Sequence, residues 1–165
     1  MPEKETMERA REDAREGKSA STQAGEFVRE EIHHIREGKH GAASAKQAIA
    51  IGLSKARRAG VQLGAPAKGK TTAKVREQAR RDHRKGQSGA GAKVSVRRSR
   101  ATLDALKKEG FGAASHKSLS RQATASAKKR GAGARHEAAK KAVRTKGAEG
   151  RRAAAKKAAR TRRAA

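Results

Sequence analysis

The sequence predicts an all-α fold: a small helical hairpin with short additional helices, and a largely disordered or loosely helical basic C-terminal part. Leu, Ile, Val and Phe supply 17 of the 165 residues. This share is about half of ~20%, the level below which highly charged chains are usually disordered. Apolar residues recur at helical spacing in only two segments. The charge is also uneven, because residues 1–60 hold 12 Lys/Arg against 10 Asp/Glu, whereas residues 61–165 hold 31 against 6. A near-neutral module followed by a strongly basic arm is therefore expected.

The N-terminal segment is predicted to form a helix that contributes little to a core. Pro2, Glu3 and Glu5 suit a first helical turn, and Gly17 suits the end of the helix. Because the segment is almost wholly polar, we expect a solvated or fraying helix. The chain is expected to have four parts. Residues 1–20 form a charged N-terminal helix, and residues 22–62 form a helical hairpin module. Residues 63–98 form a flexible basic linker with a short helix, and residues 99–165 form a basic Lys/Ala/Arg-rich tail with short helices.

Two amphipathic segments joined by a loop make up the hairpin module. The first is expected to end at Gly38; the second begins at Ser44, has Gln47 at the capping-box position, and ends at Gly60. The expected hairpin core consists of Phe27, Val28, Ile32, Ile35, Ile49 and Leu53.

Small residues share the apolar face of the second segment. Ala48, Gly52 and Ala56 lie at i, i+4 and i+8, which permits a close approach of another helix. A two-helix hairpin of this size is marginal by itself, so self-association through the hairpin is one way to stabilise it.

Gly, Ala, Ser and basic residues dominate the chain beyond Gly60. Short helices are expected at 72–85 and 99–109, with the flexible linker GQSGAGAK at 86–93 between them. Leu103 and Leu106 are the apolar residues of the second of these helices.

A short repeat marks the end of the chain. AAKKAVRTK at 138–146 recurs as AAKKAARTR at 154–162, with 7 of 9 residues identical. Ala, Lys and Arg favour helix, but dense like charge opposes it. We therefore expect coil or frayed helix in the free protein and more helix when a polyanion is bound.

Composition excludes several classes of site. There is no Cys, and Phe27 and Phe111 are the only aromatic residues, so thiolate chemistry and the stacking platforms of single-strand binders are both missing. No segment reads as a signal peptide or a membrane span. The sequence indicates no enzyme, no catalytic residue, no cofactor and no metal, and the expected location is cytoplasmic.

One segment matches the phosphate-binding loop pattern GxxxxGK[ST]. GAPAKGKT at 64–71 would direct Lys70 to the phosphates and Thr71 to magnesium. A functional loop of this kind follows a buried strand of a parallel sheet, which the sequence does not contain. We interpret the segment as a linker, and NTP binding remains the alternative.

Two Glu-x-x-His spacings lie in the first hairpin helix. Glu30 precedes His33 and Glu31 precedes His34 by three residues, and His40 follows. Carboxylate-bridged metal sites take this motif from two helices. Because only one helix offers it here, these residues are interpreted as polar groups on the outer face of the helix.

Basic runs are the remaining functional signal. With few acids nearby, they are suited to neutralising phosphates and releasing counterions from a duplex. The predicted nucleic-acid-binding residues are Arg97, Arg98, Arg100, Lys128, Lys129, Arg130, Lys140, Lys141, Arg144, Lys146, Arg151, Arg152, Lys156, Lys157, Arg160, Arg162 and Arg163.

Two stretches carry resemblances. HGAASAKQAIAIGLSKARRAG, with the preceding EEIHHIREGK, resembles a signature of small basic bacterial and phage proteins of uncharacterised function, over about residues 30–60. The Lys/Ala-rich end, residues 120–165, is similar in composition to the tails of linker histones and bacterial histone-like proteins. The second resemblance implies a DNA-compacting role for the tail.

The leading hypothesis is a histone-like, nucleoid-associated protein that binds duplex DNA without sequence specificity through residues 93–163. The hairpin would then serve in docking or self-association and raise avidity. An RNA- or ribosome-associated protein is one alternative. A stress-related, disordered protective protein is another.

Overall fold

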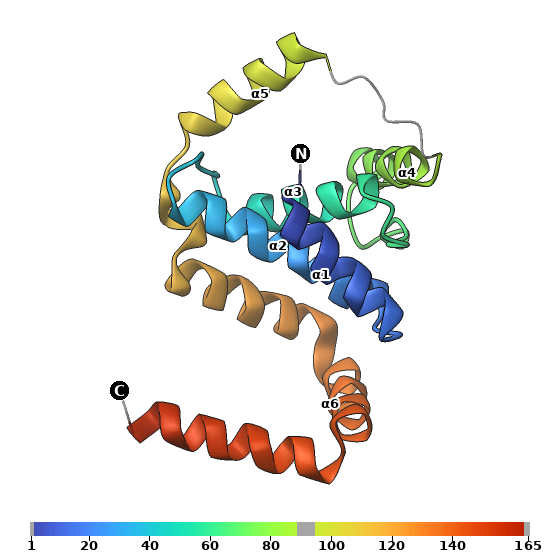
Figure 1. The fold of residues 1–165 in the computed structure, drawn as a ribbon, viewed down its shortest axis with the longest axis vertical. Helices are drawn as coiled ribbons and strands as arrows, with labels where there is room; N and C mark the ends of the chain where they lie inside the picture. The colour runs from blue at the N-terminus through green and yellow to red at the C-terminus, as the bar shows by residue number, and fades with distance from the viewer. Residues whose placement is uncertain (1, 89–94, 164–165) are drawn as a thin grey trace. The chain divides into compact units, whose positions relative to one another are not determined.

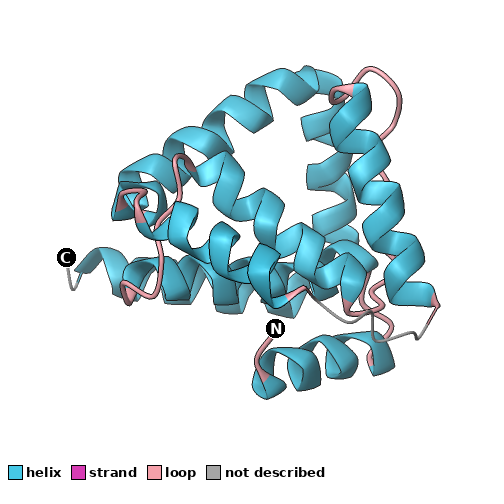
Figure 2. Ribbon diagram, turned by 90° about the horizontal axis from the view of Figure 1, so that it is seen from above, coloured by secondary structure: helices cyan, strands magenta, loops and turns pink. Residues whose placement is uncertain are grey.

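The computed structural model describes residues 2–88 and 95–163, and these residues form helices and loops without any strand (Figure 1; Figure 2). The prediction of an all-α fold is confirmed. The chain divides into two units, residues 1–120 and 121–165, which are described separately. The elements are α1 (Lys4–Arg15), α2 (Ala20–Arg36), α3 (Ala45–Arg58), α4 (Ala73–Gln87), α5 (Val96–Lys107), the 3₁₀ helix η1 (Phe111–Ala114) and α6 (His116–Arg163).

Local capping residues determine most helix boundaries. Ser44 Oγ accepts a hydrogen bond from the Gln47 backbone N–H at 3.2 Å, and the Gln47 side chain in turn accepts one from the Ala43 N–H at 2.9 Å. This exchange resembles a capping box shifted by one residue. The same side-chain cap is made at the start of four other helices, by Ser19, Thr72, Ser95 and Ser115.

Helix α1 packs against α2 and is not merely solvated, which corrects the expectation for this segment. Thr6 and Ala10 are buried, with 0% and 5% of their surface exposed. Arg9 Nε donates to Glu26 Oε2 of α2 at 2.6 Å. Two small buried residues on one face are enough to attach a helix that is otherwise polar, and a periodicity search for large apolar residues does not detect them.

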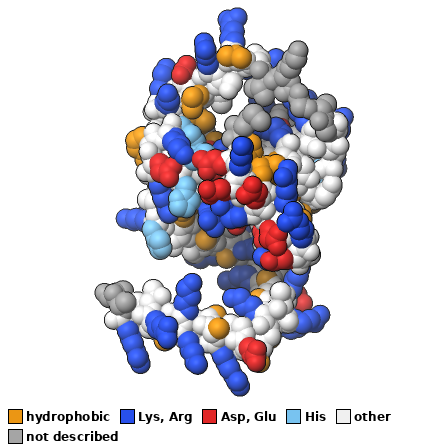
Figure 3. All heavy atoms as spheres, viewed as in Figure 1, with side chains coloured by type: hydrophobic (Ala, Val, Ile, Leu, Met, Phe, Trp, Pro, Cys, Tyr) orange, Lys and Arg blue, Asp and Glu red, His pale blue; other side chains and the backbone are white. Residues whose placement is uncertain are grey.

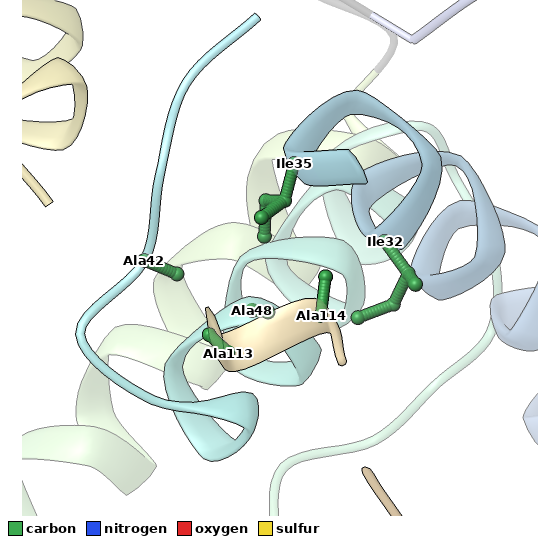
Figure 4. Close-up of a cluster of buried hydrophobic side chains, with 6 residues drawn as sticks. All are labelled: Ile32, Ile35, Ala42, Ala48, Ala113 and Ala114. Atoms are coloured by element: carbon green, nitrogen blue, oxygen red, sulfur yellow. The ribbon is translucent and has the colours of Figure 1, made fainter. Parts of the chain in front are cut away.

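Two apolar clusters form the core of unit 1. The first, shown in Figure 4, joins Ile32 and Ile35 of α2 to Ala48 of α3 and to the Ala113–Ala114 pair of η1. Arg36 Nε also donates to the Ala114 carbonyl at 3.0 Å, which fixes η1 on α2. The second cluster lies around Phe27, with Ala10, Ala24, Ala56 and Val61.

The predicted core residues are not equally buried. Phe27, Ile32 and Ile35 are buried, whereas Val28 and Leu53 are partly buried at the edges of the clusters. Ile49 is half-buried and belongs to neither cluster, because its neighbour Ala48 occupies the contact.

Gly52 explains why α3 uses small residues. A Cβ at Gly52 would lie 2.6 Å from the Val28 Cα and 3.0 Å from the Phe27 carbonyl oxygen. The backbones of α2 and α3 are therefore in direct contact, and only alanine-sized side chains fit beside the crossing.

Helix α4 belongs to the folded unit, although its segment was expected to be part of a flexible linker. Its Ala79 and Asp82 are buried. Ser54 Oγ of α3 donates to Asp82 Oδ2 at 2.6 Å, and Gly86 approaches the Arg57 carbonyl so closely that a Cβ would have no room. Positions 89–94 of the expected linker lie outside the described residues.

The α2–α3 loop is held by the end of α5. Gly41 N–H donates to the Leu106 carbonyl at 2.9 Å, and Ala42 N–H donates to the Gly110 carbonyl at 3.2 Å. Most of α5 is exposed, including Leu103. Its contribution to unit 1 is thus the backbone at its C-terminal end.

The C-terminal part is helical, which corrects the expectation of a largely disordered tail. Helix α6 extends over 48 residues and bends at Gly131 (φ 79°) and Gly147 (φ 61°). Gly adopts positive φ without the steric cost that other residues incur. Segments rich in Ala, Lys and Arg have high enough helix propensity to form despite their charge. None of the described helices has the length and apolarity needed to cross a bilayer.

Candidate nucleic-acid interface

The seventeen predicted nucleic-acid-binding residues are all exposed in the structure. Figure 3 shows Lys and Arg side chains projecting along the last segment of α6. Three of the residues, Arg97, Arg98 and Arg100, lie in the first turns of α5. There the guanidinium groups and the helix dipole have the same sign, so both favour an anion.

Acidic partners are scarce along unit 2. Between residues 121 and 163 there are 16 Lys/Arg and only two acids, Glu137 and Glu149. Among these described residues the structure has one ion pair, between Lys140 Nζ and Glu137 Oε1 at 3.3 Å. The charge of this unit is therefore largely uncompensated from within.

No residue of α6 is buried. An amphipathic helix of a globular domain would bury an apolar stripe, but Val143 is 46% exposed and the surrounding side chains are Ala, Lys and Arg. The helix thus offers its charge on all sides.

The sequence repeat coincides with a structural repeat. The two bends lie 16 residues apart, as do the two copies of the repeat. Before each copy, the arginine four residues after the glycine donates to the glycine carbonyl: Arg135 Nε to Gly131 O at 3.2 Å, and Arg151 Nε to Gly147 O at 3.0 Å. Matching cations, such as Lys140 and Lys156, therefore recur at the same distance from each bend.

The phosphate-loop match does not have the structure of a phosphate-binding loop. Residues 64–71 form a largely exposed loop before α4, and no strand precedes them within the described chain. Helix α4 begins only at Ala73, and the Thr71 hydroxyl donates to the Thr72 carbonyl at 3.3 Å. A nearby hollow of about 400 Å³ is lined by Ala65 and α4 residues and does not include Lys70 or Thr71.

The Glu-x-x-His segment differs most from expectation. Glu30 and Glu31 were interpreted as lying on the outer face of α2, but they are buried, with 4% and 0% of their surface exposed. Lys55 of α3 reaches both, with Nζ 3.3 Å from Glu30 Oε1 and 2.7 Å from Glu31 Oε2. His40 lies beside Glu31, so α2, α3 and the intervening loop meet at a charged cluster that sequence reasoning missed.

The signal for this cluster was present but incomplete. The i,i+3 spacing of Glu31 and His34 was visible in the sequence. Nothing in the sequence indicated that the face carrying Glu31 turns toward Lys55, because the two residues lie on different helices and no local pattern links them.

No family model, curated protein or solved structure matches this chain. The fold and the surface define a small helical unit that carries a long, exposed basic helix.

Proposed function

We propose that the protein binds nucleic acid, duplex DNA first, without sequence specificity, in the manner of a histone-like, nucleoid-associated protein. The observation that carries this proposal is that α6 buries none of its residues and pairs almost none of its cations internally. Leu119, near the start of α6, packs on the first apolar cluster, but from residue 121 onward the helix buries no side chain. A helix with such an exposed surface and with uncompensated charge is suited to a polyanion.

The charge density of α6 is comparable to that of a nucleic-acid strand. From residue 121 to 163 the segments sum to about 65 Å at ~1.5 Å per residue, which gives about one cation per 4 Å. Each strand of B-DNA carries one phosphate per ~3.4 Å. Along its axis, α6 therefore carries nearly as many cations as one DNA strand of equal length carries phosphates.

The bends allow this pairing to follow a curved partner. Gly131 and Gly147 interrupt the helix while the arginine after each glycine repeats the same contact. Phosphate contacts position a protein and do not read bases, and α6 has no Phe, Tyr or Trp side chain on which bases could stack. Sequence-independent binding follows.

Helical structure in the tail also bears on the protective-protein alternative. That alternative depends on a disordered chain, whereas residues 116–163 are helical. The RNA alternative uses the same cations and becomes one outcome of the binding test.

The test is salt-dependent binding of the full chain to a random-sequence duplex and to a structured RNA of equal charge. We expect log K for the duplex to fall with log salt at a slope near −0.9 for each phosphate engaged, for about ten phosphates. Replacing Lys140, Lys141 and Arg144 with Gln should reduce the magnitude of the slope by about 2.7.

A matched control removes the same charge from unit 1. Lys4, Arg11 and Lys46 are exposed on α1 and α3, and their replacement with Gln should leave the slope within about one phosphate of the original. Equal losses from both triple variants would overturn the assignment to α6. Clearly tighter binding of the structured RNA would mean that RNA, and not duplex DNA, is the partner.

A further inference from the structure

Glu31 is a buried carboxylate without a hydrogen-bond partner. Its side chain is wholly enclosed, and neither Oε1 nor Oε2 accepts a hydrogen bond. Lys55 Nζ lies 2.7 Å from Oε2 and pairs with it by charge, but its angle is not that of a hydrogen bond. A buried carboxylate with unused lone pairs is costly unless a cation or donor compensates it.

Two imidazoles lie next to this carboxylate. Donor atoms of Glu31, His34 and His40 all lie within 4.8 Å of one another. The His40 Nε2 is 3.4 Å from Glu31 Oε1, which is too far for a good hydrogen bond and leaves Oε1 unpartnered. The two rings are nearly perpendicular, with centroids 6.2 Å apart.

We propose that Glu31, His34 and His40 form a binding site for one divalent transition-metal ion of the Zn²⁺ type. Imidazole nitrogen and carboxylate oxygen bind zinc at about 2.0–2.2 Å. Two ligands of a tetrahedron with such bonds lie about 3.4 Å apart, which is the separation of His40 Nε2 and Glu31 Oε1. Two imidazoles with one carboxylate are a donor set for zinc or ferrous iron and not for Mg²⁺ or Ca²⁺.

The surroundings of both histidines fit ligation. His40 is 8% exposed, and its Nδ1 lies 3.1 Å from the Gly41 carbonyl, which fixes the tautomer that leaves Nε2 with a free lone pair. Glu3 Oε1 lies 2.8 Å from His34 Nε2. Such carbonyl and carboxylate contacts orient metal-bound imidazoles in proteins.

The charge of the cluster also favours a cation. Glu30 and Glu31 are both buried, and Lys55 is the one ammonium group that pairs with them among the described residues. Two carboxylates against one ammonium leave a buried negative charge when the histidines are neutral. A divalent ion at the Glu31 side would compensate it.

The loop that carries His40 is rigid enough to serve as a ligand platform. Gly41 and Ala42 donate to backbone carbonyls at the end of α5, and Gly41 packs so closely on Glu109 that a Cβ would have no room. A metal ion would thus fasten α2 to this loop, which makes its role structural.

The test uses the full-length, nuclease-treated and chelator-stripped protein with zinc chloride alone. Calorimetry should show one saturable site with Kd in the micromolar range or tighter, and saturating Zn²⁺ should raise Tm by about 5 °C or more. Magnesium chloride should not change Tm measurably. Because no nucleic acid is present, failure here is independent of the proposed DNA binding.

The matched control is His33, which is exposed on the same helix and forms the other Glu-x-x-His spacing with Glu30. E31Q and H40N should each lower Zn²⁺ affinity at least tenfold, whereas H33N should leave it unchanged. Co²⁺ bound to the wild-type protein should give the visible absorption of nitrogen and oxygen coordination, a readout that needs no variant. Absence of a saturable site, or equal loss in H33N, would overturn the proposal.

Discussion

Replacing Gly52 with Ala should destabilise unit 1, although the same replacement at Gly25 should stabilise it. Both glycines lie inside helices, so alanine improves helix propensity at each by about 0.5–1 kcal/mol. They differ in what surrounds them. A Cβ on Gly25 of α2 would have nothing within 4 Å, whereas a Cβ on Gly52 would lie 2.6 Å from the Val28 Cα and 2.9 Å from its nitrogen.

The steric cost at Gly52 follows from those distances. Carbon atoms in contact prefer about 3.5–4.0 Å, so α2 and α3 must separate by about 1 Å at their crossing. Both obstructing atoms are backbone, and no side-chain rotation relieves them. Overpacking of this kind costs about 1–3 kcal/mol. At the upper end of that range, the gain in propensity leaves a net loss of about 2 kcal/mol for G52A.

Thermal unfolding followed by far-UV circular dichroism measures both variants. A change of 1 kcal/mol moves Tm by about 3–5 °C in a unit of this size, so G52A should melt about 6–10 °C lower and G25A a few degrees higher than the wild type. If both variants shift in the same direction, or if G52A is as stable as the wild type, the close crossing of α2 and α3 is not what holds unit 1 together.

Three further changes test separate contacts. R57M should cost about 1–2 kcal/mol of unfolding free energy, because Arg57 Nε donates to the Leu63 carbonyl at 3.1 Å and methionine leaves that carbonyl without this donor. Burial, which lowers the pKa of this guanidinium, acts in the opposite direction. D82A should cost about 2 kcal/mol and raise amide exchange in α4, since Ser54 donates to this buried carboxylate. The pKa of Lys18 is raised mainly by its hydrogen bond to Asp13 and next by its hydrogen bond to Glu16. A lysine whose pKa is raised on folding contributes stability that is complete below pH ~10.4 and is lost as the pH rises through the folded-state pKa. K18M should therefore flatten the alkaline limb of the curve of unfolding free energy against pH.

Each of these expectations has a contrary result. Unchanged denaturant midpoints for R57M would mean that the 61–64 loop is held by other contacts. Unaltered exchange in α4 of D82A would show that Ala79 and Gly86 alone fix the helix. An alkaline limb that is the same in K18M and wild type would assign it to other groups.

The ends of α1 and α2 and both ends of α3 were predictable because they depend on short-range signals, whereas α2 and α5 begin earlier than expected, after Ser19 and Ser95. Ser44 with Gln47, and the glycines that follow α1, α2 and α3, act within a few residues of the chain. The identity of the core was harder to predict. Ile49 is larger and more apolar than Ala48, yet Ala48 is buried, because the crossing at Gly52 favours small side chains.

Burial of charge was not predictable from the pattern. Glu30 and Glu31 read as polar residues of an outer face, and their burial depends on Lys55 from another helix. The packing of α4 depends similarly on Asp82, a charged residue that a hydrophobicity pattern counts as exposed. Tertiary pairing of this kind overrides local polarity.

The helical tail shows that helix propensity outweighs like-charge repulsion in these segments, which is the opposite of what was expected. Like-charge repulsion was expected to outweigh propensity in segments such as 138–146. Screening by salt weakens repulsion between exposed charges more than about 8–10 Å apart, whereas propensity acts at every residue. Alanine at about every second or third position of these segments is sufficient for helix.

The 16-residue interval between Gly131 and Gly147 has a consequence for how this arm could change length. A duplication or deletion of one whole interval would alter its contour by about 24 Å and its charge by several cations, and it would keep every later cation in phase with its preceding bend. Changes of any other size would shift that phase. The length of this part of α6 can therefore change in steps of 16 residues without altering where the cations lie relative to the bends.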